Sequence, residues 1–166
     1  MLVAAVLTYV RPSEPYSVTQ NTATPESNEH PELRSFRLDQ PGKHVFHFRQ
    51  TRREEVNLLL EVQGPVRGER ERQELTHLGL TIEVALVNHK GQTVCHAVGS
   101  PQDGVTADSW VVTTGGSGAA FWHRSCSDFK MNRSQYTLTV LLRDVGPKTP
   151  KVIVTPIFAR SDNFGM

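Results

Sequence analysis

Cysteine is scarce in this chain, and its two residues lie far apart in the sequence. Cys95 and Cys126 form no Cys-x-x-Cys motif, so neither a zinc site nor a thioredoxin-like site is indicated. In an oxidising compartment the two could form one disulfide, whereas in a reducing compartment they are better interpreted as two small buried residues. His123 precedes Cys126, but a cysteine nucleophile needs a base that the fold positions beside it. We therefore prefer the structural interpretations to a catalytic one.

Long hydrophobic runs are also missing. Residues 1–10, MLVAAVLTYV, are apolar but fall short of the about 20 residues that a transmembrane helix needs. The run resembles the centre of a secretory signal without its basic start, and no cysteine follows it for lipid attachment. It is either the remainder of an export signal that begins upstream or a first strand. We favour export, and expect the protein in the periplasm or cell envelope, without a transmembrane span.

An excess of either charge is absent as well, with 18 Lys and Arg against 17 Asp and Glu. No basic stripe is visible in the sequence, so nucleic acid is not an expected partner. The seven histidines are scattered along the chain. His44 and His47 lie on opposite faces of a predicted strand, so they cannot share a metal ion unless the strand has a bulge. We predict that the protein binds no metal and no cofactor.

Catalytic motifs are lacking too. Residues 115–118, GGSG, have neither the Lys nor the Ser/Thr of a phosphate-binding loop, and they precede a strand instead of a helix. The same residues miss the Gly-x-Ser-x-Gly elbow of serine hydrolases by one position. No pair of carboxylates stands out as the pair that a glycosidase needs. We therefore predict that the protein is not an enzyme.

What the sequence does contain is a series of short apolar runs separated by turn signals. Alternating apolar and polar residues, as in residues 80–87, predict strands with one buried face. About eight or nine such runs without βαβ alternation predict an all-β fold, an antiparallel β-sandwich of Greek-key, immunoglobulin or jelly-roll type. The runs are residues 33–38, 43–49, 56–62, 80–87, 93–98, 109–113, 119–124, the second half of 129–142, and 151–159.

The chain is predicted to divide into three parts. Residues 1–32 combine the apolar run with a polar, proline-rich arm, residues 33–160 form the sandwich, and residues 161–166 are a loose tail. At the start of the sandwich, residues 33–38 and 43–49 flank the turn signal DQPG and are predicted to form a hairpin. Pro156, inside the last run, indicates an edge strand or a bulge.

One segment breaks the strand pattern. Residues 68–79, GERERQELTHLG, are rich in helix formers and predict a short surface helix. Arg70 and Glu74 lie one helical turn apart, which allows an ion pair. Leu75 and Leu78 are expected to pack against the sandwich, and Gly79 is placed to end the helix.

Tyr136 stands at the start of the strand predicted within residues 129–142. Asn132 and Ser134 can close a turn before it, and the tyrosine hydroxyl could return to a backbone group of that turn. This would be the tyrosine corner of Greek-key sandwiches, in a form that looks like the fibronectin type. The alternative is an ordinary, half-buried aromatic residue of a strand. Both alternatives concern the fold and imply no chemistry.

The C-terminal part of the chain resembles an uncharacterised family of exported bacterial β-sandwich proteins, many of them lipoproteins. The resemblance covers roughly a third of the chain and rests on Tyr136, Leu138, Val140, the loop 147–150 and the strand with Pro156. The sequence departs from the lipoprotein pattern because it lacks the acylated cysteine near its start. The resemblance implies a non-enzymatic envelope protein without a known ligand, and a protective or toxin-neutralising role.

The two tryptophans are the best candidates for binding. Trp110 and Trp122 can stack on sugars or anchor a protein interface if they are exposed, and His123 and Arg124 would then join them. The favoured alternative is that both tryptophans belong to the core or its margin. Our first hypothesis is an exported interaction module that binds another protein, with an immunity-type, toxin-neutralising protein as its specific version. The alternative is a carbohydrate-binding module with exposed aromatic residues.

Overall fold

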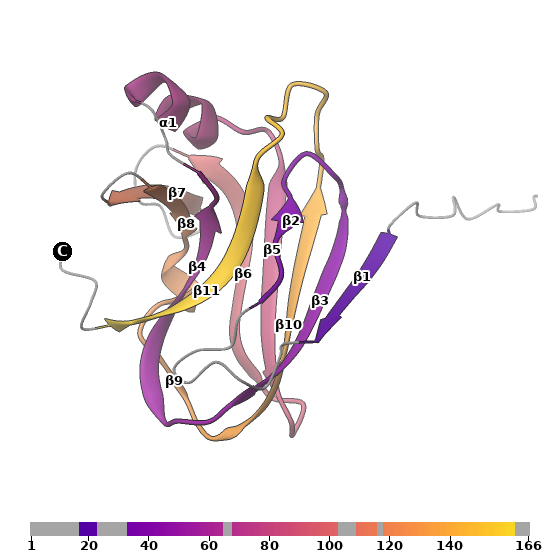
Figure 1. Ribbon diagram of the computed structural model, residues 1–166, viewed down its shortest axis with the longest axis vertical. Coiled ribbons are helices and arrows are strands. Elements are labelled where there is room, and N and C mark those ends of the chain that lie inside the picture. The colour runs from indigo at the N-terminus through magenta and orange to yellow at the C-terminus, as the bar shows by residue number, and fades with distance from the viewer. Residues whose placement is uncertain (1–16, 23–32, 65–67, 103–108, 116–117, 162–166) are drawn as a thin grey trace, which may run out of the picture.

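The strands of this protein form one continuous sheet that folds over on itself into two layers (Figure 1). The computed structural model describes residues 17–22, 33–64, 68–102, 109–115 and 118–161. Layer A holds β1, β3, β10, β5 and β6 in that order, and layer B holds β7, β8, β4, β11 and β2, with β9 paired to β4. The strands are β1 Ser17–Thr22, β2 Phe36–Arg37, β3 Gly42–Gln50, β4 Glu54–Val62, β5 Thr81–Asn88, β6 Thr93–Gln102, β7 Ser109–Gly115, β8 Gly118–Trp122, β9 Phe129–Met131, β10 Ser134–Arg143 and β11 Ile153–Arg160.

Strand β6 connects the two layers. Its first part pairs antiparallel with β5, and its last three residues pair in parallel with β7. Strands distant in the sequence are neighbours, β3 with β10 and β4 with β11, as in Greek-key sandwiches. The predicted antiparallel β-sandwich with one short helix is confirmed, although two of the described pairings, β1 with β3 and β6 with β7, are parallel.

Alternating burial fills the space between the layers. Alternate residues are buried from Ile82 to Leu86 in β5 and from Tyr136 to Leu142 in β10, and the residues between them are half-buried on the outer face. In β3 the predicted inner face, His44, Phe46 and Phe48, is buried, whereas His47 and Arg49 are exposed on the outer face. The 2-residue period of a strand therefore assigned the inner and outer faces of layer A correctly.

The predicted hairpin of residues 33–38 and 43–49 is wrong. β2 pairs with β11, and β3 pairs with β1 and β10, so the two runs lie in different layers. The rings of Phe36 and His44 stack at 4.6 Å between their centroids, face to face across the core. In a hairpin the two strands pair with each other, whereas in an arch they belong to different layers. Both arrangements need the same turn and the same alternation of residues, so the local sequence could not distinguish them. The partner of β2 is instead β11, a strand distant in the sequence.

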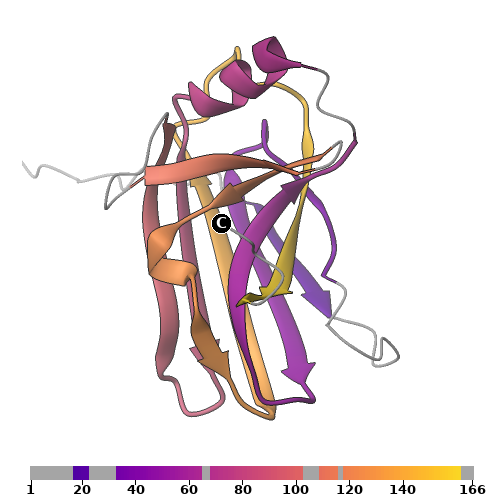
Figure 2. The ribbon, with the colours of Figure 1, turned by 90° about the vertical axis from the view of Figure 1, so that its left-hand side faces the viewer.

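Helix α1, Glu69–Thr76, lies across one end of the two layers (Figures 1 and 2). Leu75 and Leu78 are buried beneath it, and Arg70 Nε lies 3.3 Å from a carboxylate oxygen of Glu74, as predicted. The predicted stop at Gly79 is wrong, because the helix ends at Thr76. The hydroxyl of Thr76 donates to the carbonyl of Gln73 at 2.9 Å, which provides a local partner for that helix carbonyl. None of the described helices has the length and apolar character required to cross a bilayer.

Tyr136 forms a tyrosine corner. Its hydroxyl donates to the carbonyl of Asn132 at 3.2 Å and accepts from the amide of the same residue at 2.9 Å. Its ring packs on Phe48, with 5.8 Å between the centroids. Of the two alternatives that the sequence left open, the corner is the one observed.

Cys95 and Cys126 are joined by a disulfide, with 5.2 Å between their Cα atoms. Cys95 lies on β6 of layer A, and Cys126 ends the 3-10 turn η1, Arg124–Cys126, which follows β8. Both residues are buried. The bond therefore ties the segment that leaves layer B to the last strand of layer A.

The predicted arm contains a strand that the sequence did not reveal. β1, Ser17–Thr22, lies parallel to β3 along its edge, from Gly42 to His47. Its sequence, SVTQNT, has no alternation of apolar and polar residues that would have indicated a strand. The division of the chain at residues 33 and 160 stays a prediction. The apolar run 1–10, the tail from residue 162 and the tip of the GGSG turn lie outside the described residues.

His44 gives the fold a predicted dependence on pH. It is 7% exposed, both ring nitrogens lack a hydrogen-bond partner among the described residues, and burial lowers the pKa of the imidazole. Its cross-strand neighbour Val140 and its stacking partner Phe36 carry no charge.

We expect stability to be complete above the ordinary pKa of histidine, about 6.5, and to fall as the pH decreases below it, because the unfolded chain then binds the proton more readily. Urea midpoints at about pH 7.5 and about pH 5 measure the effect. His44→Leu should reduce the difference between them, and the exposed His47→Leu should not. Equal pH dependence in both variants would contradict this assignment.

Candidate functional site

Two of the four predicted binding residues are buried. Trp110 is fully buried, and its indole Nε1 donates to the carbonyl of Ile82 at 3.0 Å. His123 is 2% exposed and lies edge-on to Trp110, with 5.1 Å between the ring centroids. Its Nδ1 accepts a hydrogen bond from the amide of Ser125 at 3.1 Å and thereby caps η1. Trp110 thus lies in the core, and a ligand on the surface can reach neither ring.

Trp122 and Arg124 lie nearer to solvent. Trp122 is half-buried and points away from Phe121, which is fully buried, as the alternation predicted. β8 ends at Trp122 and not at residue 124, so Arg124 belongs to η1. Arg124 is exposed. The structure therefore leaves Trp122 and Arg124 available for binding, on two different elements.

Trp122 belongs to an apolar row on the outer face of layer B. The strand register places Val111, Trp122, Leu59 and Ile157 side by side across β7, β8, β4 and β11. We call these four residues the outer row. Leu59 is 5% exposed, and the other three are half-buried. The strand neighbours of Trp122 within this row are aliphatic.

The row ends at β11, whose edge away from β4 is paired over only part of its length by the residues that the structure describes. Gln63 N donates to Ile153 O, and Leu38 N donates to Val152 O on the opposite side of the chain. Since backbone groups alternate along a strand, the odd-numbered residues of β11 face β4 and the even-numbered residues face away from it. β2 pairs with β11 only at Ile153 and Val154.

Beyond Val154, the backbone groups of Pro156, Phe158 and Arg160 that face away from β4 have no strand partner among the described residues. We call this stretch the β11 edge. Pro156 has no N–H to leave unpaired there, which agrees with the predicted edge strand.

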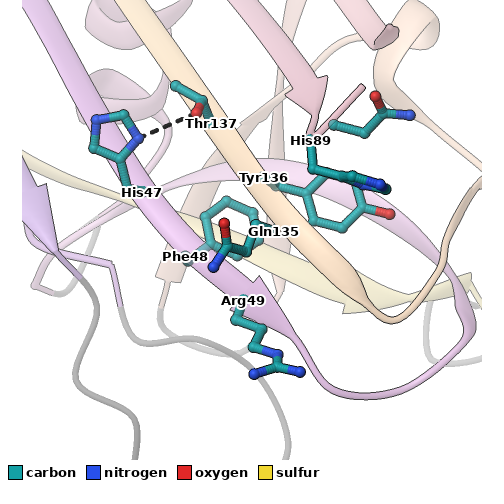
Figure 3. Close-up of a pocket in the computed structure, with 8 residues that line it drawn as sticks. His47, Phe48, Arg49, His89, Gln135, Tyr136 and Thr137 are labelled. Atoms are coloured by element: carbon teal, nitrogen blue, oxygen red, sulfur yellow. Dashed lines mark hydrogen bonds between the residues drawn. The ribbon is translucent and has the colours of Figure 1, made fainter. Parts of the chain in front are cut away.

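The outer face of layer A has a polar hollow of about 480 Å³ where β3, β10 and the end of β5 adjoin (Figure 3). Arg49 is opposite Gln135 and His47 is opposite Thr137 in the register of β3 and β10. His47 Nδ1 lies 3.1 Å from Thr137 Oγ1. The residues that line the hollow are His47, Phe48, Arg49, Asn88, His89, Gln135, Tyr136 and Thr137.

The sequence analysis placed His47 and Arg49 on one face of a strand but did not identify this hollow. Its polar residues come from β3, from β10 and from the end of β5 with the turn that follows it, so no local motif contains them. The only available signal was the outer-face alternation of residues 45, 47 and 49.

Comparison with known proteins adds little to this picture. No protein-family model and no curated protein matches the sequence. Among solved structures, the pre-peptidase C-terminal domain of a collagenase from Bacillus anthracis is similar over 89% of this chain and 99% of that one. The sequence identity is 11% and the TM-score is 0.40, so the argument about function rests on this protein's own residues.

Proposed function

We propose that this protein is an exported, non-catalytic β-sandwich module that binds another protein as an extended segment. The observation that carries the proposal is the β11 edge, with Pro156, Phe158 and Arg160 open to pairing beside the apolar outer row. An added strand would take up the free N–H and C=O groups of Phe158 and Arg160 and the free carbonyl of Pro156. The residue of the added strand that lies beside Ile157 would place its side chain on the outer face of layer B and extend the outer row.

The neighbours of Trp122 favour a protein over a sugar. Sugar sites combine an exposed aromatic face with polar groups that bind hydroxyls. Trp122 instead lies between Val111 and Leu59 within the outer row. A large aromatic side chain surrounded by aliphatic residues is typical of the centre of a protein interface.

Export to the periplasm or cell envelope is part of the proposal. The Cys95–Cys126 disulfide supports it, because disulfides persist in oxidising compartments and are rare in the cytosol. A toxin-neutralising partner role is its most specific version. In that version the β11 edge and the outer row would cover an extended segment of the toxin.

The test compares proteins that co-purify with the wild type and with Trp122→Ala from the exported fraction of the native host. A true partner should be retained by the wild type and by Thr139→Ala, a matched change on the outer face of layer A, and lost with Trp122→Ala. In the free protein, the amides of Phe158 and Arg160 should exchange with solvent faster than those of Ile157 and Ala159. In the complex the difference should disappear.

Two results would contradict this function. A partner that binds Trp122→Ala as well as wild type does not use the outer row. Unchanged exchange at Phe158 and Arg160 in the complex means that no strand is added to the β11 edge. Saturable binding of an oligosaccharide that Trp122→Ala abolishes would instead establish the carbohydrate-binding alternative.

A further inference from the structure

The hollow on layer A has an unusual balance of polar groups. Of its eight lining residues none is a carboxylate, while Arg49, His47, His89 and Gln135 all carry N–H donors. Phe48 and Tyr136 are buried, so their rings belong to the core. Hydrogen bonding in the hollow therefore depends mainly on nitrogen donors.

Several of these side chains are oriented by contacts with the protein and still have N–H groups without a partner among the described residues. Arg49 has no ion-pair or hydrogen-bond partner in the part of the chain that the structure describes. The Nδ1 atom of His47 contacts Thr137, and the Nδ1 atom of His89 contacts Ser134. Each contact orients an imidazole ring while its Nε2 atom keeps no protein partner among the described residues. In Figure 3, Gln135 lies between His47 and Arg49, and His89 lies across β10 from it, over the ring of Tyr136.

Cationic residues lie in turns near the hollow. It adjoins the end of the sandwich opposite α1, where the turns 51–53, 89–92 and 132–133 lie (Figure 2). These turns hold Arg52, Arg53, Lys90 and Arg133, whereas Glu54 and Glu55 follow the first turn at the start of β4. Glu54 pairs with Arg160 at 3.2 Å, and the cations of the turns outnumber the carboxylates at this end. The clustered charges create a positive potential that attracts anions to the hollow.

We propose that this hollow binds the phosphate group of a small, soluble ligand. The planar guanidinium of Arg49 can hold two phosphate oxygens at once, and the side-chain amide of Gln135, its cross-strand neighbour, can donate to a third. The imidazoles of His47 and His89 complete the set of donors. Its volume, about 480 Å³, suits a small molecule. This site lies on layer A and does not depend on the outer row or the β11 edge of layer B.

The test is a titration of the protein with inorganic phosphate at constant pH and ionic strength. Nuclear magnetic resonance should show saturable shifts of the Arg49 guanidinium and Gln135 side-chain signals, which chloride at equal ionic strength does not reproduce. Arg49→Gln should weaken binding by about tenfold or more, since it removes the charge-assisted pair. Arg49 is exposed, so this variant should fold like the wild type.

Two matched variants separate a site from general attraction. Arg70→Gln removes the same charge from α1, where its side chain is 92% exposed, and should leave the affinity unchanged. Arg52→Gln removes a charge from the surrounding turns and should weaken binding by about twofold at most. Equal effects of Arg52→Gln and Arg49→Gln, or no saturable shift at the hollow, would overturn the proposal.

A second experiment tests whether the phosphate group belongs to a soluble ligand or to a lipid headgroup. Phosphatidylcholine vesicles with and without phosphatidic acid are sedimented with the protein. The proposal requires that phosphatidic acid adds no binding that depends on Arg49. If the protein sediments with phosphatidic acid vesicles and Arg49→Gln abolishes this, the site binds a lipid headgroup. That result would overturn the proposal of a soluble ligand.

Discussion

Replacing both cysteines, Cys95→Ala together with Cys126→Ala, is expected to lower the free energy of unfolding by about 2–4 kcal/mol. The disulfide closes a loop across a sequence separation of 31 residues, and this restricts the unfolded chain. It also joins β6 of layer A to η1, which follows β8 of layer B. The native protein should therefore lose stability without a change of fold.

Urea unfolding of the wild type with and without a reductant, beside the double variant, measures this effect. The reduced wild type should approach the stability of the variant, and the variant should not respond to the reductant. Alkylation of the unreduced wild type should label no thiol. A wild type that is fully labelled, or equally stable with and without reductant, would rule out a disulfide in the folded protein.

Trp110→Ala is expected to lower the free energy of unfolding by about 3–5 kcal/mol. The side chain is fully buried, and its removal leaves a cavity beside His123 and removes the hydrogen bond from the indole to the carbonyl of Ile82. Because domain stability is typically about 5–15 kcal/mol in total, much of the variant would unfold at moderate temperature. Trp110 was a candidate for binding, and this result would assign it to the core.

Trp110→Phe and Trp122→Ala serve as controls for this prediction. Trp110→Phe keeps most of the ring volume and should lose less stability than Trp110→Ala. Trp122→Ala removes a half-buried ring from the outer face and should also lose clearly less. Thermal unfolding and urea unfolding measure all three variants. If Trp122→Ala proves as costly as Trp110→Ala, the outer row is a second core and not a binding surface.

The sequence predicted the strands well where one strand face is buried and the other is not. Residues 80–87 and 43–49 alternate clearly, and β5 and β3 follow them closely. Tyr136 also followed its local signal, since the corner joins residues only four positions apart. The pairing of β2 could not be predicted in this way, because its partner β11 lies more than 100 positions along the chain.

The candidate site was harder to predict than the fold. Alternation in residues 119–124 separated Phe121 from Trp122, but it could not show that Trp110 lies inside the core. Alternation also could not show that Val111, Leu59 and Ile157 lie in one row with Trp122. Their positions depend on strand register, which is set by the pairing of whole strands. The outer row is thus a product of register across four strands.

The sequence by itself determined the all-β class, the inner and outer faces of the main strands, and the two cysteines that could pair. These properties follow from side-chain alternation and residue type, which are local. Only the tertiary structure decided which strands pair and that the described strands leave part of β11 without a partner. It also decided that Arg49, His47 and His89 share one hollow. Such contacts join residues distant in the chain, and their positions depend on how the two layers bury their common core.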